Sequence, residues 1–502
     1  MTPAPTPAQE KKSAIIIGAG IGGLALGIRL QSAGIATTIV EGKERAGGGA
    51  GIFVRDGFTF DTGPSTLTSP DSFAELWRLT GQDMAQDVAL CPVAPHLRLM
   101  WPDGTQFDIS ADDTAIKQEI ARLDSSDLAG YERFTNYSTE ALRGLNRQWT
   151  ATSFTDFPSM AKMLPTLMQM QSWRSVYGLV SSTVRNEYLR QALSFQTLLY
   201  GGNPLTTPAW HAAGWRLEQE SGLWAVRGGT HRLIAAMITQ FERIGGTMRL
   251  GDPVVRLDTI GDRITAVVTQ DGWHGEADTI ASTVDLMRLY SELLASHPRG
   301  AKQAEALSRK HWSPSAFTLF FGMRGTWPGI AHRMFLPGPR FTGLMTDIFQ
   351  HGLLSADMAI FLDHPTVTDP SLAPEGCSVF RATVPVPHMG KLPIDWQEQG
   401  PLYAERILQE IGHRLIPDIE ERIITRFHLA PPDYAADFGL WRGSLNSLEP
   451  ALSQSGWMRP HNRDDVIPNL YLAGAGTHPG AGIPAVLAGA RITAQMIQKD
   501  IL

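Results

Sequence analysis

The sequence predicts an α/β protein in which a Rossmann-like dinucleotide-binding domain is joined to a second, α+β domain. A strand, a glycine turn, a helix and a second strand follow one another over residues 13–41. A glycine-rich turn between a short apolar strand and another helix occupies residues 469–491. The length of 502 residues exceeds the size that one hydrophobic core usually reaches. Together these observations indicate two domains, with both ends of the chain contributing to nucleotide binding.

The first motif has the residues that hold a nucleotide pyrophosphate. Gly18 allows a tight turn, Gly20 allows the backbone to approach the phosphates, and Gly23 allows the helix to pack on the strand. The N-terminus of the helix then offers free N–H groups and a positive dipole end to the phosphates. Glu41 ends the second strand, where a carboxylate can accept ribose hydroxyls and disfavours a 2′-phosphate. This pattern favours FAD or NAD over NADP; the alternative is a purely structural glycine turn.

Two later glycine clusters extend the predicted ligand footprint. The first, at residues 47–49, comes six residues after Glu41 and favours the longer FAD molecule over NAD. The second lies in the C-terminal motif, where a strand ends at Ala473 and a helix of small residues begins near Ile483. Such a helix start would present N–H groups to an electron-rich group, for instance a reduced flavin ring. The alternatives are a hairpin with glycine turns for the first cluster and a plain packing unit for the second.

Composition excludes several classes of protein. The 43 basic and 50 acidic residues give a net charge of −7, which argues against nucleic-acid binding. Cys91 and Cys377 are too few for a disulfide framework or a thiolate metal site, and a reducing compartment is expected. Residues 1–12 are proline-rich and predicted to be a disordered lead without a secretory signal. No apolar run is long enough to cross a bilayer. A nucleophile elbow is also absent from the sequence.

Residues between 111 and 224 are predicted to be largely helical, with an apolar stripe. The stripe comprises Phe154, Phe157, Met160, Met163, Leu164, Leu167, Met168 and Met170. A stripe of this kind is more often part of a core than a binding surface. The alternative is a mobile apolar lid that contacts a membrane, where flexible methionine side chains tolerate a sliding lipid. Three histidines, His388, His461 and His478, lack metal-ligand spacing and are predicted to be structural, and no metal is expected.

Taken together, these segments resemble the bacterial phytoene desaturases, FAD-dependent carotenoid desaturases within the amine-oxidase-like flavoproteins. The resemblance covers nearly the whole chain. It is carried by residues 18–23, 57–64, 173–177, 193–195, 201–204, 227–230, 372–377, 384–388, 447–450, 459–464 and 474–484. The last three runs are the most specific.

The resemblance implies a domain organisation and a set of cofactor contacts. Residues 13–99, 225–304 and 441–502 would form an FAD-binding domain of the glutathione reductase type, and residues 100–224 and 305–440 would form the substrate domain. The expected FAD-binding residues are Gly18, Ala19, Gly20, Ile21, Gly22, Gly23, Glu41, Gly48, Gly63, Pro64, Val254, Gly474, Ala475, Gly476, Gly482 and Ile483. The backbone of Val254 would meet the adenine, and residues 474–484 would lie near the isoalloxazine.

The resemblance also implies the activity. The expected reaction is stepwise desaturation of 15-cis-phytoene towards lycopene or neurosporene, with hydride transfer to the flavin and reoxidation by quinone or dioxygen. Arg459, His461 and Arg463 are the catalytic candidates expected nearest the flavin. The enzyme would be cytoplasmic and attached to the membrane surface, from which it collects its lipophilic substrate. Alternatives are a desaturase for C30 diapophytoene or hydroxylated carotenoids, a flavin amine oxidase, and a non-catalytic prenyl-binding escort protein.

The sequence departs from the family pattern in three places. Gly49 stands where the family has an arginine near the FAD phosphates, and Arg45 and Arg55 are the candidates to replace that cation. The pair at residues 225–226 lacks the usual aromatic residue and proline, and Ala485 replaces a glycine. We expect these last two changes to alter the shape of the substrate channel more than the chemistry.

Overall fold

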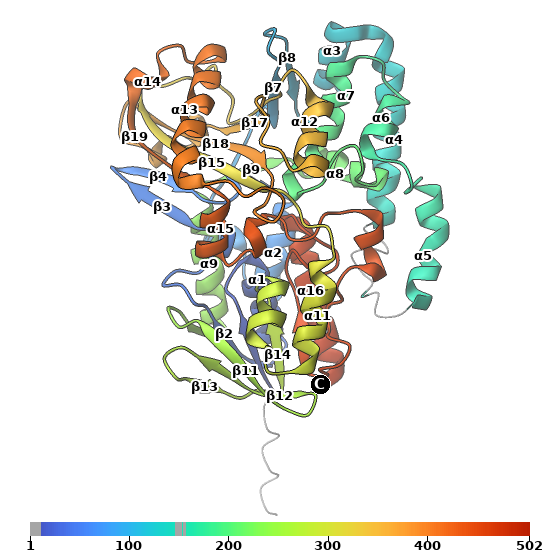
Figure 1. The fold of residues 1–502 in the computed structure, drawn as a ribbon, viewed down its shortest axis with the longest axis vertical. Coiled ribbons are helices and arrows are strands. Elements are labelled where there is room, and N and C mark those ends of the chain that lie inside the picture. Colours follow the sequence, from blue (N-terminus) through green and yellow to red (C-terminus); the bar gives the residue numbers. More distant parts are fainter. Residues whose placement is uncertain (1–11, 146–152, 154–156) are drawn as a thin grey trace, which may run out of the picture.

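The computed structural model describes residues 12–145, 153 and 157–502. A parallel five-stranded sheet with the order β10-β2-β1-β14-β20 forms the centre of the lower half in Figure 1. Its strands are β1 (Ser13–Ile17), β2 (Ala36–Val40), β10 (Thr247–Arg249), β14 (Thr279–Ser282) and β20 (Leu470–Leu472). Segments far apart in the sequence therefore meet in one sheet.

Both faces of this sheet are covered, which explains why β1 is apolar from Ala14 to Ile17. Ala14 and Ile16 point into a core shared with the helices α1 (Ile21–Ser32), α9 (Thr230–Arg243) and α16 (Ile483–Ile501). Ile15 and Ile17 point to the other face, against the antiparallel strands β11 (Val254–Ile260), β12 (Arg263–Thr269) and β13 (His274–Gly275). A strand buried on both faces reads as a continuous hydrophobic run and not as an alternation.

The upper half contains a mixed seven-stranded sheet with the order β19-β15-β18-β17-β16-β7-β8. Its strands are β7 (Leu97–Met100), β8 (Gln106–Ile109), β15 (Ser315–Arg324), β16 (Arg333–Leu336), β17 (Ile360–Asp363), β18 (Cys377–Val386) and β19 (Ile423–Leu429). The pair β7 and β16 is parallel, and the other neighbours are antiparallel. The domain boundary predicted between residues 99 and 100 falls inside β7.

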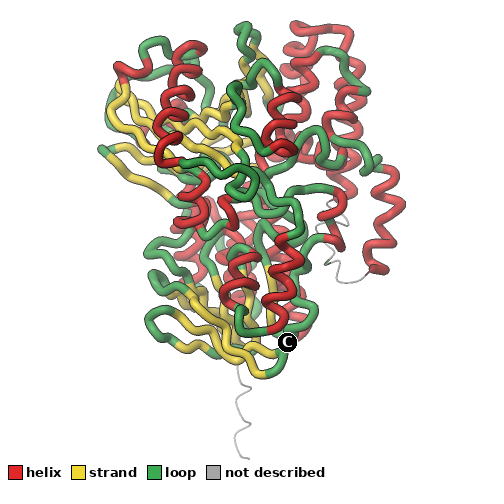
Figure 2. Tube along the Cα trace, in the orientation of Figure 1, coloured by secondary structure: helices red, strands yellow, loops and turns green. Residues whose placement is uncertain are grey.

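Helices flank this sheet on two sides, as Figure 2 shows. The helix α13 (Trp396–Arg414) packs into the core around β15 and β18. A separate core holds α3 (Asp113–Asp124), α4 (Leu128–Gly144), α6 (Val176–Ser181) and α7 (Glu187–Ser194), which confirms the predicted helical character of this part. Besides α5, which is described below, the other α-helices are α2 (Pro70–Arg78), α8 (Ala213–Ser221), α10 (Leu286–Arg288), α11 (Pro298–Ser308), α12 (Phe341–Thr346), α14 (Ile419–Arg422) and α15 (Pro431–Phe438).

Two small sheets join the halves. The hairpin of β3 (Ile52–Arg55) and β4 (Phe58–Asp61) lies against β15, where a Cβ on Gly322 would come within 2.7 Å of the Phe58 ring. The other sheet has the order β5-β9-β6 and consists of β5 (Leu67–Thr68), β9 (Leu223–Val226) and β6 (Leu90–Pro92). Segments near the first nucleotide motif are thus packed directly on the second domain.

The predicted methionine and aromatic stripe divides between two environments. It lies on α5 (Phe157–Gln169), which projects at the right of Figure 1, and in the turn that follows. Met163, Leu167 and Met170 are buried in a small cluster with Trp210. Leu164 and Met168 are exposed by 50% and 66%. Phe154 lies outside the described residues. Among the described helices, none has the length and hydropathy of a membrane span.

The packing of α1 on β1 gives a first prediction. A Cβ on Gly23 would lie 2.0 Å from the Gly18 carbonyl oxygen, a backbone atom that cannot swing aside. Gly23→Ala should lower the free energy of unfolding by about 1–3 kcal/mol, the range measured for overpacking a tight core. Urea unfolding of the apoprotein measures the change. The control is Gly214→Ala on α8, where the nearest atom would be 3.8 Å away; equal losses in both variants would contradict this packing.

Candidate functional site

The turn after β1 forms a cradle of backbone amides. Gly18 has φ = +101° and its N–H donates to the Val40 carbonyl, so the chain turns sharply between β1 and α1. Gly20 is the residue before α1 and no side chain caps this helix start. The first N–H groups of α1 therefore remain available to an anion. These features fit the pyrophosphate of a dinucleotide.

The second glycine cluster lies against the first. Gly20 and Gly47 form an isolated parallel bridge, and the Gly47 N–H donates to the Ala19 carbonyl oxygen at 2.9 Å. Gly47 and Gly48 have positive φ angles, and a Cβ on Gly48 would be only 3.3 Å from the Gly20 Cα. Larger residues would fill the groove between the two turns. The groove is therefore lined by backbone, as a close-fitting nucleotide requires.

Glu41 is held in place by two backbone amides. Its Oε2 accepts the Ala19 N–H at 2.8 Å, and its Oε1 accepts the Lys43 N–H at 3.0 Å. A carboxylate has about four lone-pair sites, so two of them remain for ribose hydroxyls. Ala19 thus contributes to the site by orienting Glu41, although it does not itself line the cavity.

The C-terminal motif lines the same cavity from the end of β20, an edge strand of the five-stranded sheet. β20 ends at Leu472, and residues 474–482 form a loop that leads into α16. Arg459 stabilises this loop, because its buried guanidinium donates to the carbonyl oxygens of Ala475 at 2.7 Å and Thr477 at 3.1 Å. Burial lowers the pKa of Arg459 to about 10, so the side chain remains a cation at neutral pH. A fixed positive charge therefore lies beside this loop.

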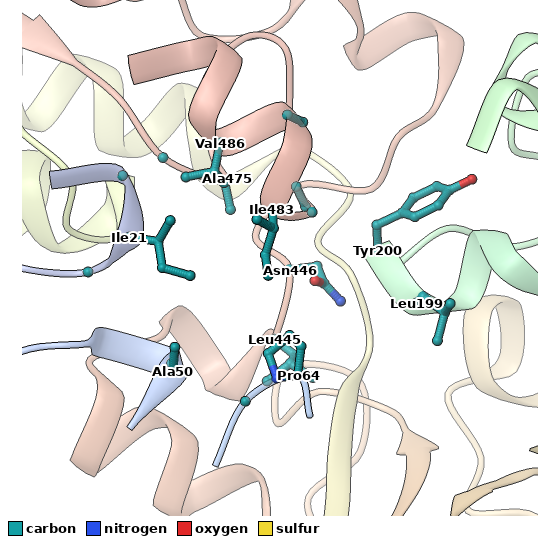
Figure 3. Close-up of a pocket in the computed structure, with 18 of the residues that line it drawn as sticks. Ile21, Ala50, Pro64, Leu199, Tyr200, Leu445, Asn446, Ala475, Ile483 and Val486 are labelled. Carbon is teal, nitrogen blue, oxygen red and sulfur yellow. The ribbon is translucent and has the colours of Figure 1, made fainter. Parts of the chain in front are cut away.

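One cavity of about 1530 Å³ connects these segments with the second domain. Figure 3 shows Ile21 and Ala50 on one side of the open space and Tyr200 on the other, with Ile483 at the start of α16 facing it. Of the residues predicted to bind the cofactor, the cavity is lined by Gly18, Gly20, Ile21, Gly22, Glu41, Gly48, Gly63, Pro64, Val254, Gly474, Ala475, Gly482 and Ile483. The structure therefore brings segments from four distant parts of the sequence together.

Three predicted cofactor residues serve packing around the cavity. Ala19 and Gly23 lie beside Glu41 and β1 as described above, and Gly476 faces away from the cavity. A Cβ on Gly476 would come within 2.7 Å of the Leu286 side chain. None of the three is among the residues that line the cavity.

Two catalytic candidates lie elsewhere. His461 is bound by the Asp465 carboxylate and the Trp457 carbonyl, and the hydrogen bond with Asp465 raises the pKa of its imidazole. Arg463 pairs with Asp500 at 3.1 Å and lies over the Tyr471 ring. Neither residue lines the cavity, whereas Arg459 does. Asp465 holds His461 and Asp500 holds Arg463 in positions outside the cavity lining.

The two arginines predicted to replace the arginine of the family pattern, Arg45 and Arg55, also lie outside the cavity lining. Arg55 is exposed on β3, where it pairs with Asp56 at 3.7 Å, and neither it nor Arg45 lines the cavity. Lys43 does line it, with its Nζ 4.3 Å from the centre of the Phe438 ring. The two predicted substitutes therefore do not bring a cation to the cavity lining, whereas Arg29, Arg288 and Arg491 do line it.

Sequence reasoning missed several polar residues of the cavity. Asp285, which caps α10, has a buried Oδ2 without a partner among the described residues, and burial raises the pKa of its carboxyl to about 6. Four charged side chains line the part of the cavity next to the seven-stranded sheet: Glu218, Arg333, Asp363 and Arg381. The register of that sheet aligns Arg333, Asp363 and Arg381, and the packing of α8 adds Glu218, so no local sequence signal could identify them.

The position of Glu41 gives a prediction about nucleotide binding. Glu41→Ala removes both acceptors for the ribose, and charge-assisted hydrogen bonds of this kind stabilise a complex enough for the affinity to fall about 10- to 100-fold. Titration of the apoprotein with FAD, followed by flavin fluorescence, measures the affinity. Glu44→Ala, an exposed neighbour, should leave it unchanged. Retention of full FAD affinity by Glu41→Ala would exclude this carboxylate from the site.

Comparison with known proteins agrees with this geometry. Residues 21–498 match the family described as flavin containing amine oxidoreductase. The chain is 45% identical over 490 residues to the lycopene-forming phytoene desaturase of Paracoccus sp. strain N81106, covering 98% of each protein. It is 35% identical to the neurosporene-forming phytoene desaturase of Cereibacter sphaeroides, covering 98% of this chain and 96% of that protein.

Solved structures show the same fold at low sequence identity. Putrescine oxidase bound to putrescine matches with a TM-score of 0.62 and 15% identity, over 99% of this chain and 100% of that one. Cyclohexylamine oxidase from Brevibacterium oxydans matches with a TM-score of 0.60 and 13% identity, over 97% and 100%. The glycine cradle, the oriented Glu41 and the C-terminal loop fit FAD, which is the cofactor. The chain is an FAD-dependent oxidoreductase and belongs to the phytoene desaturase family of flavin containing amine oxidoreductases.

Proposed function

We propose that this chain is a phytoene desaturase that introduces double bonds stepwise, towards lycopene or neurosporene. The observation that carries the proposal is the single cavity that runs from the nucleotide cradle into the second domain. Beyond the cradle, its walls include Leu97, Leu142, Leu217, Met334 and Phe361. An apolar passage that ends at a flavin suits a long hydrocarbon.

The chain itself contributes positioning and charge. When bound, FAD supplies the hydride acceptor that amino-acid side chains lack. Arg459 remains protonated at neutral pH and is already bonded to loop carbonyls, so it stabilises negative charge and does not act as a base. The apolar walls exclude water and align the carbon chain along the cavity. Restoring the oxidised enzyme requires an electron acceptor, for which quinone and dioxygen are our candidates.

A membrane surface is the proposed source of the substrate. We define the α5 face as the exposed side chains of Leu164, Met168, Trp173, Trp457 and Met458. α5 contacts the short turn Gly456–Met458, so the two parts of this face adjoin. Tryptophan and methionine suit a membrane interface, because one is amphipathic and the other adapts to irregular apolar surroundings. A hydrocarbon that is insoluble in water can reach the cavity from such a surface.

Membrane attachment can be tested by reversing the polarity of this face. The double variant Met168→Glu and Trp173→Glu should reduce co-sedimentation with liposomes by about tenfold or more, since charge is costly at the apolar boundary. The control is Ile260→Glu, which places a charge on an equally exposed apolar residue of β11. Equal liposome binding by the double variant and the wild type would exclude the α5 face.

The activity itself is tested with purified protein, FAD and liposomes that contain phytoene. The expected result is a flavin-dependent series of products with increasing absorption wavelength, separated by HPLC. Conversion of the C30 analogue but not of phytoene would reassign the substrate. Oxidation of a primary amine in place of either polyene would indicate an amine oxidase. Binding of a prenyl chain without any flavin-dependent product would indicate an escort protein.

A further inference from the structure

Three aromatic rings are stacked in the wall of the cavity. The centre of the His211 ring is 3.8 Å from that of Trp210 and 5.3 Å from that of Tyr200, with interplanar angles of 26° and 23°. All three residues line the cavity, and we call them the ring stack. Stacked rings restrict one another's orientation, so the ring stack is a preformed part of the wall.

The ring stack lies next to the loop that leads into α16. A Cβ on Gly482, the residue before this helix, would lie 4.0 Å from the Tyr200 Cβ. Arg459, whose guanidinium donates to the loop carbonyls, is close enough to His211 for its charge to act on the imidazole. Figure 3 shows Tyr200 across the open space from Ile21. The rings therefore line the part of the cavity in which the flavin ring is expected to lie.

The ring stack is electron-rich and carries no charge. The segment from Gln196 to Gly214, which contributes all three rings, contains no acidic residue. Burial, and then the Arg459 charge, lower the pKa of His211 to about 3, so the imidazole is neutral at physiological pH. The faces of tyrosine and tryptophan rings carry partial negative charge and attract cations. A positive charge in this part of the cavity is therefore attracted by the rings and is not repelled by an imidazolium.

The removal of a hydride from a polyene creates such a charge. The C–H bond breaks, and both of its electrons leave with the hydrogen, which goes to the flavin. The carbon is left positive, and the charge spreads over the neighbouring double bonds. The adjacent carbon then releases a proton to water, and the electron pair of that C–H bond becomes the new double bond. One hydride and one proton are thus lost for each double bond formed.

Two opposite charges therefore develop in this reaction. Arg459 is a buried cation beside the loop, where it stabilises negative charge. The same cation disfavours positive charge on the polyene, because like charges repel more strongly in a site of low dielectric constant. The ring stack lines the cavity close to Arg459 and has the opposite polarity. The chain thus has a separate group for each of the two charges.

We propose that the ring stack of Tyr200, Trp210 and His211 stabilises the positive charge that develops on the polyene during hydride removal. This inference rests on the proposed desaturase function and assigns groups of this chain to its first chemical step. The rings act on the transition state, because the uncharged polyene gains little from a cation–π contact. They therefore raise the rate of C–H cleavage and leave the affinity for phytoene nearly unchanged.

Fluorination tests the charge-stabilising role of the rings with little change in their size. Tyr200→Phe is the reference, and position 200 then carries 4-fluoro- or 3,4,5-trifluorophenylalanine, introduced by amber suppression. Fluorine withdraws electrons from the ring face, so the rate at which phytoene bleaches the bound FAD without oxygen should fall stepwise, by about tenfold for the trifluoro ring. The rate compared is the one that perdeuterated phytoene slows, since that rate reports C–H cleavage. The FAD affinity and the polyene retained after vesicle removal should stay constant.

A second pair of variants tests the middle ring. His211→Leu removes a ring and should slow the same step about tenfold, whereas His211→Phe keeps a ring and should recover most of the rate. The matched control is the fluorinated series at Phe380, whose ring stacks on the His364 imidazole at 4.4 Å outside the cavity lining. This control should leave the rate unchanged.

The outcomes separate this inference from the proposed function. Equal rates across the fluorinated series at position 200 would overturn the role of the ring stack and leave the desaturase function standing. A loss of retained polyene that accounts for the whole fall in rate would also overturn it, because the rings would then bind the ground state. An equal fall in the Phe380 series would do the same, since the effect would act through folding. If phytoene neither reduces the FAD of the wild type nor is converted, the proposed function fails, and this inference fails with it.

Discussion

The close approach of three backbone turns around the start of α1 is the constraint on which the site depends. The turn after β1, the turn at residues 47–50 and the loop after β20 meet where the parallel strands end. A Cβ on Gly22 would lie 3.0 Å from the Val486 side chain, and one on Gly48 would lie 3.3 Å from the Gly20 Cα. Because glycine has no side chain, these turns leave a groove lined by backbone N–H groups. A pyrophosphate fits in the space that side chains would otherwise fill.

The arginines that line the cavity differ in how many hydrogen bonds they make to the protein. Arg459 is buried and Arg381 is half-buried, and each donates several hydrogen bonds to fixed acceptors, so each stabilises the position of a loop or a strand. Arg333 is half-buried and, among the described residues, donates one long hydrogen bond of 3.5 Å to Glu218. An under-satisfied cation in a wall has a free energy that depends on what fills the cavity.

The local parts of the site were predictable from the sequence, and the parts set by tertiary register were not. The helices starting at Ile21 and Ile483 follow from glycine turns after apolar strands, and the structure confirms both. Arg459, His461 and Arg463 are close in sequence, yet only Arg459 reaches the cavity, because Asp465 and Asp500 bind the other two. The choice depends on partners that local spacing does not specify.

A row of charged side chains in the cavity wall illustrates the same limit over longer distances. Arg333, Asp363 and Arg381 are separated by 30 and 18 residues, and only the pairing of β16, β17 and β18 aligns them. A hydrocarbon is recognised by shape alone, and one methylene more or less changes its binding by only about 1–3 kcal/mol. A polar group in the wall discriminates more sharply, because a ligand that leaves it unpaired incurs its desolvation cost. The cofactor motifs therefore do not reveal the polar residues of the cavity wall, because sheet pairing over long sequence distances places them there.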